Sequence, residues 1–192
     1  MCGIAGSVNF KLSYQRINDV MLHRGPDEQN GFTKDNVDLY HLRLSIIDIT
    51  GGRQPIHSED YRYTIIFNGE IYNHQSIRDK YALQGKTSSD TETLLLLYQK
   101  LGVKMLDELD GMFVFIIYDS TEKKLFIARD RAGKKPVYYF NDGKKIVFAS
   151  ELNCLRALLP LEINDTNFYQ YLRLGSFYKQ QTPYKNVNEL GA

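Results

Sequence analysis

Cys2 is the side chain with the clearest chemical potential, because it directly follows Met1 and precedes a run of small residues at 3–6. Removal of Met1 would leave a thiol and a free α-amine on one residue. A cysteine thiol has an unperturbed pKa of about 8.5, whereas an α-amine titrates at about 7.7–8.0, so much of the amine is available as a base near pH 7. One residue could therefore supply both a nucleophile and the base that activates it.

The composition is that of an ordinary globular protein, with 43% hydrophobic and 24% charged residues in 192. This length fits one domain. The formal net charge of +1 gives no sign of a nucleic-acid-binding surface. The apolar runs are too short to span a bilayer, and the first residues lack the features of a signal peptide.

With only two cysteines, Cys2 and Cys154, we expect no disulfide scaffold and a cytoplasmic location. We interpret Cys154 as core filling.

The elements that must position Cys2 are mostly short strands. Strands are predicted at 3–10, 38–44, 63–67, 70–72, 112–119, 125–130, 137–140 and 146–150, and helices at 14–22, 76–83, 91–101, 151–159 and 165–174. Short charged turns between strands of the second half imply antiparallel pairing. The apolar run at 113–117 does not alternate, so both of its faces are expected to be buried. The pattern predicts stacked antiparallel sheets with helices outside.

Turn and cap signals mark the ends of several elements. Asn68-Gly69 predicts a two-residue hairpin turn between strands 63–67 and 70–72. The Gly-Pro pair within 23–27 predicts a turn there. Candidate N-caps are Ser88, Ser89 and Asp90 for helix 91–101, and Asp165 or Thr166 for helix 165–174.

Five motifs follow the MCGI start in a fixed order: HRGPD at 23–27, RLSIID at 43–48, NGEIYNH at 68–74, SDTE at 89–92 and ARDRAGKKPVYY at 128–139. Each motif is weak alone. Together they resemble the glutaminase domain of glutamine-dependent asparagine synthetases, which are amidotransferases with an N-terminal cysteine nucleophile. The resemblance covers essentially the whole chain. It implies an α+β fold, namely a four-layer αββα sandwich of two antiparallel sheets, the N-terminal-nucleophile hydrolase fold.

The resemblance also implies which residues form a glutamine site. Cys2 would attack the carboxamide, and the Asn68 side-chain amide with the Gly69 N–H would form the oxyanion hole. Arg43 would bind the α-carboxylate, which suits a guanidinium fork, and Asp90 would bind the α-ammonium group. Residues implied to complete the pocket are Leu44, Ile46, Ile47 and Glu70.

Each of these residues also has a plain structural interpretation. Arg43 could be an exposed residue at a strand end, and Glu70 a solvated strand residue. Asn68-Gly69 could be a simple turn, and Asp90 an ordinary helix cap. The sequence does not separate structural from catalytic roles for the turn at 23–27, which we expect near Cys2.

The reaction implied is hydrolysis of L-glutamine to glutamate and ammonia through a Cys2 thioester. We expect no metal or organic cofactor for this step, with ATP and Mg²⁺ used only by an absent synthetase domain. Residues 1–192 are interpreted as one domain, with a tail from about 183 leading toward the synthetase domain of the same longer chain. L-glutamine and that domain are the expected partners, a homodimer is left open, and neither nucleic acid nor membrane is expected.

Aspartate is the leading candidate for the ammonia acceptor, and sugars or polysaccharide precursors are the alternative candidates. Two other functions stay open on the sequence. One is a different N-terminal-nucleophile amidase, which would not require Arg43 or Asp90. The other is a non-catalytic binding module that keeps the fold.

Overall fold

The structure is a computed structural model that describes residues 1–45 and 52–192. Within these residues the chain forms two antiparallel sheets, as predicted. The larger sheet has the order β10–β8–β9–β1–β3–β2, with bounds Val187–Glu189, Tyr138–Asn141, Ile146–Ala149, Gly3–Val8, Val37–Arg43 and Glu28–Lys34. The smaller sheet has the order β4–β5–β6–β7, with bounds Ile56–His57, Tyr63–Ile71, Gly111–Asp119 and Lys124–Arg129. Strand β1, which directly follows Cys2, pairs with β3 on one side and β9 on the other.

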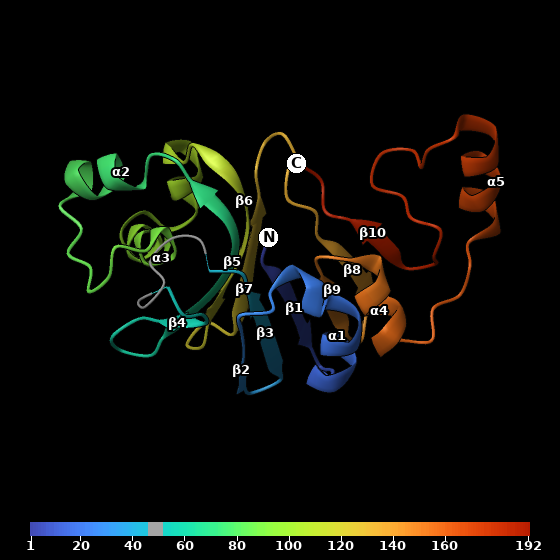
Figure 1. The fold of residues 1–192 in the computed structure, drawn as a ribbon, viewed down its shortest axis with the longest axis horizontal. Coiled ribbons are helices and arrows are strands. Elements are labelled where there is room, and N and C mark those ends of the chain that lie inside the picture. The colour runs from blue at the N-terminus through green and yellow to red at the C-terminus, as the bar shows by residue number, and fades with distance from the viewer. Residues whose placement is uncertain (46–51) are drawn as a thin grey trace.

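Helices cover the outer face of each sheet (Figure 1). Helices α1 (Tyr14–Met21) and α4 (Leu152–Leu158) pack against the larger sheet, and their buried residues share one apolar cluster with it. Helices α2 (His74–Tyr81) and α3 (Asp90–Leu101) pack in the same way on the smaller sheet. A third apolar cluster lies between the two sheets. The layers are therefore helix, sheet, sheet and helix, and the predicted αββα sandwich is confirmed.

Strand β6, at the centre of the smaller sheet, contributes to two of these clusters. Phe113, Phe115 and Ile117 pack toward the helices. Val114 and Ile116 lie between the sheets. Full burial of such a side chain stabilises the fold by about 1.5–3 kcal/mol. The prediction that both faces of this strand are buried is confirmed.

The predicted hairpin turn at Asn68-Gly69 is wrong. Both residues lie inside the continuous strand β5, where Asn68 pairs with Val114 and Gly69 with Phe113. The nine-residue register with β6 buries apolar side chains before and after this pair, at 65–67 and 71, and this tertiary pairing outweighs the local turn preference. Gly69 serves a different need, because a Cβ there would lie 2.2 Å from the Met112 carbonyl oxygen.

Several boundaries also differ from expectation. Strand β2 was not predicted, since its sequence is mostly polar and its position at the sheet edge comes from pairing with β3. Ser89 caps α3, as one of the three candidates, but Asn164 and not Asp165 or Thr166 caps α5 (Asp165–Leu174). Strand β10 falls within the predicted tail and pairs with β8. Two short 3₁₀ helices complete the elements, η1 at Leu22–Arg24 and η2 at Gly102–Glu108. None of the helices in the described part of the chain could cross a membrane.

Candidate active site

Cys2 is held at the start of the central strand β1 by contacts on both sides. The Arg24 Nε donates a hydrogen bond to the Cys2 carbonyl oxygen at 3.1 Å, and Arg24 is itself paired with Glu151 at 2.8 Å. The Ile4 N–H donates to the Ser150 hydroxyl at 3.0 Å. The backbone that carries the thiol is therefore fixed, which places Arg24 of the HRGPD motif in a supporting role. His23, its neighbour, is exposed and contacts Glu151.

The Cys2 sulfur is half-buried and contacts the backbone of Leu44. The Leu44 N–H donates to Sγ at 3.4 Å, and the thiol lies 3.6 Å from the Leu44 carbonyl oxygen. Burial raises the pKa of the Cys2 thiol, and this is the largest effect. Smaller effects lower that pKa, namely the hydrogen bond from the Leu44 N–H and the positive charges of the N-terminus, Arg43 and Arg24. The thiol form is therefore favoured in this state, so attack by the sulfur requires a base.

The edge of β5 beside Cys2 presents backbone donors in a row. The Phe67 N–H donates to the buried Gln54 side chain at 2.6 Å, and the Ile71 N–H donates to Asp90 at 3.1 Å. Alternate N–H groups of a strand point to the same edge. The Gly69 N–H, midway between them, therefore points to this edge and into the cavity that Gly69 lines. The continuous strand β5, and not a turn, therefore directs the Gly69 N–H into the cavity.

The Asn68 side-chain amide is a second donor at this position. Asn68 is only 2% exposed, and within the described residues no atom accepts a hydrogen bond from its Nδ2. An unpaired buried donor costs about 1–3 kcal/mol, so proteins rarely retain one without a reason. The strand beneath it is held rigidly, because the His41 ring nitrogen lies 3.1 Å from the Phe67 carbonyl oxygen. Two donors, one from the side chain and one from the backbone, are therefore preorganised in the cavity.

Charged side chains stand around the same cavity. Arg43 is 5% exposed and lies 3.4 Å from Glu28 of β2, which also contacts Arg53. Asp90 is equally buried, and burial raises the pKa of its carboxyl group while the Ile71 N–H lowers it. A guanidinium and a carboxylate at one cavity can bind the two charged groups of an α-amino acid.

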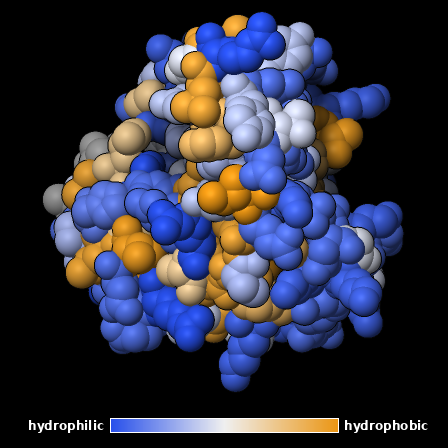
Figure 2. Space-filling model, turned by 90° about the vertical axis from the view of Figure 1, so that its right-hand side faces the viewer, coloured by the Kyte–Doolittle hydropathy of each residue, from blue (hydrophilic) through white to orange (hydrophobic). Residues whose placement is uncertain are grey.

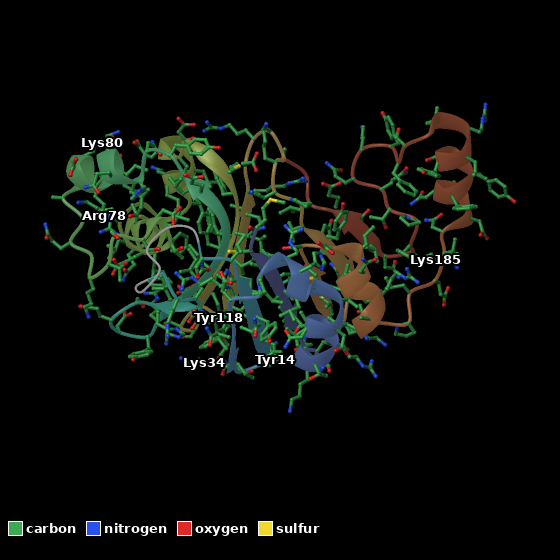
Figure 3. The ribbon with its side chains drawn as sticks, in the orientation of Figure 1. Tyr14, Lys34, Arg78, Lys80, Tyr118 and Lys185 are labelled. Atoms are coloured by element: carbon green, nitrogen blue, oxygen red, sulfur yellow. The ribbon has the colours of Figure 1, made fainter. Side chains whose placement is uncertain are left out.

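Arg78 of α2 fixes the start of α3, on which Asp90 lies (Figure 3). Its guanidinium donates to the Ser89 and Thr87 carbonyl oxygens at 2.9 and 2.7 Å and to the Thr93 hydroxyl at 2.6 Å. The Ser89 hydroxyl caps the helix by accepting the Thr91 N–H. These contacts hold Asp90 in place independently of any ligand.

The cavity has a volume of about 130 Å³ and contains every predicted site residue that the structure describes: Cys2, Arg43, Leu44, Asn68, Gly69, Glu70 and Asp90. Ile46 and Ile47 lie outside the described residues.

The sequence analysis did not predict other residues that line the cavity, among them Gln54 and Lys135. Gln54 carries no local signal, whereas Lys135 belongs to the fifth motif and could have been singled out. Among the described residues, no three His, Cys, Asp or Glu side chains form a group able to hold a metal ion.

Cys154 is not among the described residues that line this cavity. It is fully buried in the cluster between the helices and the larger sheet, so its interpretation as core filling is confirmed. Burial raises the pKa of the Cys154 thiol to about 12, with a smaller contribution from Glu151. Cys154 is therefore an internal reference for the reactivity of Cys2.

The chain belongs to the glutamine amidotransferase domain family, whose pattern it matches over residues 1–192. This class agrees with a leading cysteine at a cavity that suits an amino acid. Among its relatives is asparagine synthetase B (glutamine-hydrolysing) of Escherichia coli, 38% identical over 171 residues, which cover 84% of this chain and 30% of that protein. Another is asparagine synthetase 2 (glutamine-hydrolysing) of Arabidopsis thaliana, 39% identical over 165 residues, which cover 81% of this chain and 28% of that protein. The chain thus spans less than a third of these two relatives.

Solved structures share the fold. The glutamine phosphoribosylpyrophosphate amidotransferase of Bacillus subtilis, complexed with ADP and GMP, aligns with a TM-score of 0.67 at 22% identity, covering 82% of this chain and 43% of that one. A structure described as the allosteric regulatory enzyme of purine biosynthesis aligns with a TM-score of 0.69 at 21% identity, with the same coverage. These likenesses agree with the two-sheet sandwich described above.

Proposed function

We propose that this enzyme domain hydrolyses L-glutamine to glutamate and ammonia and supplies the ammonia to a synthetase domain of the same longer chain. The observation that carries the proposal is the convergence on one cavity of a leading thiol, an arginine, a buried carboxylate and an amide donor that has no acceptor within residues 1–45 and 52–192. The family membership and the glutamine-hydrolysing relatives support it.

The proposed reaction begins with Met1 removed, since Met1 otherwise holds the Cys2 nitrogen in a peptide bond. The free α-amine accepts the thiol proton, and the sulfur attacks the carboxamide carbon of glutamine. The Asn68 Nδ2 and the Gly69 N–H donate to the oxyanion of the tetrahedral intermediate. The proton passes to the departing nitrogen, ammonia leaves, and water hydrolyses the γ-glutamyl thioester. Arg43 and Asp90 hold the α-carboxylate and the α-ammonium group. None of these steps uses a metal or organic cofactor.

The acceptor that we propose for the ammonia is aspartate, with ATP and Mg²⁺ acting in the synthetase domain. The support is that the relatives named above are asparagine synthetases and are several times longer than this chain. Sugars and polysaccharide precursors are the alternative acceptors. Asparagine formation by the longer chain, compared with ammonia release alone, distinguishes them.

The end of the molecule formed by α5 is our proposed contact face for that longer chain. Phe168, Leu172 and Leu174 of α5 are 43%, 63% and 65% exposed. Figure 2, which looks at this end, shows hydrophobic groups on its surface among hydrophilic ones. Homodimerisation through the α5 end of the molecule would compete with its contact to the longer chain.

We also infer a cytoplasmic location, supported by the two cysteines, neither of which forms a disulfide.

The test is active-site trapping with 6-diazo-5-oxo-norleucine on protein from which Met1 has been removed. We expect stoichiometric labelling of Cys2, loss of ammonia release from glutamine, and no labelling of Cys154. The Cys2→Ser variant should lose both labelling and hydrolysis, while Cys154→Ala should keep both. Labelling at Cys154 or at no residue contradicts the proposal. Hydrolysis that is unaffected by loss of Arg43 or Asp90 indicates a different amide substrate.

A further inference from the structure

The loop between β7 and β8, part of the fifth motif at 128–139, reaches the Cys2 cavity through Lys135. Its centre is Asp130, which is 2% exposed. The Asp130 carboxylate accepts four backbone hydrogen bonds, from Phe113, Ala132, Lys134 and Lys135, at 2.9–3.2 Å. A carboxylate with this many donors fixes the path of the loop.

Arg129 holds the same loop from its other side. Its guanidinium donates to the carbonyl oxygens of Gly133 and Lys135, at 2.6 and 2.8 Å, and pairs with Glu189 of β10 at 2.7 Å. The two networks bind only the backbone of the loop. They therefore determine where the Lys135 side chain lies without occupying its ammonium group.

The Lys135 side chain is directed into the Cys2 cavity. Lys135 is 5% exposed and lines the cavity together with Met1 and Cys2. Within the described residues, its ammonium group has one hydrogen-bond partner, the Met1 sulfur at 3.1 Å. A thioether is a weak acceptor, and buried lysines are otherwise paired with carboxylates. Lys134, its neighbour, is exposed.

The two arginines near Cys2 contact acidic side chains. Arg24 is paired with Glu151, and Arg43 contacts Glu28. Of the acidic residues that the structure describes, Asp90 and Glu70 line the cavity.

Burial lowers the pKa of Lys135, and so does Arg24. The pKa of Lys135 is raised by the negative charges of Cys2, Asp130 and Glu70. The interaction with Cys2 is favourable because an ammonium group stabilises a nearby thiolate.

We propose that Lys135 is a positioning residue of the glutaminase reaction, acting through Cys2: its ammonium group stabilises the thiolate and keeps the Cys2 α-amine uncharged once Met1 is removed. The inference rests on the proposed function. A cation disfavours a second positive charge beside it and favours a negative one. A less basic amine begins the cycle able to accept the thiol proton, and it passes that proton more readily to the departing nitrogen.

The experiment compares wild-type protein without Met1 with the neutral variants Lys135→Met and Lys135→Gln, the charged variant Lys135→Arg and the exposed control Lys134→Met. Two profiles are measured against pH: kcat/KM for ammonia release from glutamine, and the rate of iodoacetamide alkylation at Cys2 followed by intact mass. In both neutral variants we expect both midpoints to rise by about one pH unit, the lower end of the effect of a neighbouring charge on a pKa. Alkylation at pH 7 should slow about tenfold. Lys135→Arg and Lys134→Met should keep the wild-type midpoints.

Three outcomes are decisive. Unchanged midpoints in the neutral variants refute the role of Lys135. If kcat/KM is then lower across the pH range, Lys135 has a structural role only. The two neutral variants differ in polarity, so misfolding of one, detected by thermal unfolding, leaves the other to decide. If wild-type protein releases no ammonia while the neutral variants still raise the midpoint of Cys2 alkylation, the proposed function is refuted and the effect of Lys135 on Cys2 is retained.

Discussion

Replacement of Asn68 by alanine should separate catalysis from stability. Asn68 is 2% exposed and lines the same cavity as Cys2. Its Nδ2 has no acceptor among the described residues, and we assign this donor to the oxyanion of the intermediate. Removal of one such donor costs about 2.7–4 kcal/mol of transition-state stabilisation, which corresponds to a 10²–10³-fold loss of kcat. KM for glutamine should change little, because the donor acts on charge that develops only during the reaction.

The same substitution should leave the fold almost as stable as before. Within the part of the chain that the structure describes, the buried Nδ2 has no acceptor, which costs about 1–3 kcal/mol. Its removal relieves that cost and offsets the packing lost with the amide. We therefore expect the free energy of unfolding to change by less than about 1 kcal/mol.

Asn167 provides the matched control. It is 9% exposed, but its Nδ2 donates to the Thr182 carbonyl oxygen at 2.8 Å. Asn167→Ala leaves that buried oxygen without this donor, so it should lose about 1–3 kcal/mol in urea unfolding and keep wild-type kcat. Equal destabilisation by both variants, or a wild-type kcat in Asn68→Ala, would refute the reasoning.

Two further predictions test the charged end of the cavity and the support beneath β5. Asp90→Asn keeps an acceptor for the Ile71 N–H but removes the charge. KM for glutamine should therefore rise about 10- to 150-fold, as expected from about 1.5–3 kcal/mol for a charged hydrogen bond. An unchanged KM contradicts its role. Burial lowers the pKa of His41 to about 4, so its unfolded form, near pKa 6.5, binds more protons. Stability from this group is full above pH 6.5 and falls between pH 6.5 and 4 by about 3 kcal/mol. Urea unfolding should show this extra loss in wild type and not in His41→Gln, and equal losses refute it.

Much of this site could be predicted from the order of short motifs behind Cys2. Strands and helices were predicted where apolar periodicity is strong, as in β6 and α3. Prediction failed where the local signal and the tertiary pairing disagree. Asn68-Gly69 has the residues of a turn, but nine pairs with β6 extend the strand through it. The polar β2 became a strand only because β3 offers it an edge.

The sequence by itself determined the chemical inventory: a thiol behind Met1, an arginine, carboxylates and an Asn-Gly pair at fixed intervals. Only the tertiary structure decided how these groups face one another. The direction of the Gly69 N–H follows from its position on a strand edge, between donors already taken by Gln54 and Asp90. The entry of Lys135 into the cavity follows from the loop held by Asp130. Such directions arise from contacts between residues far apart in the chain, which local sequence patterns do not encode.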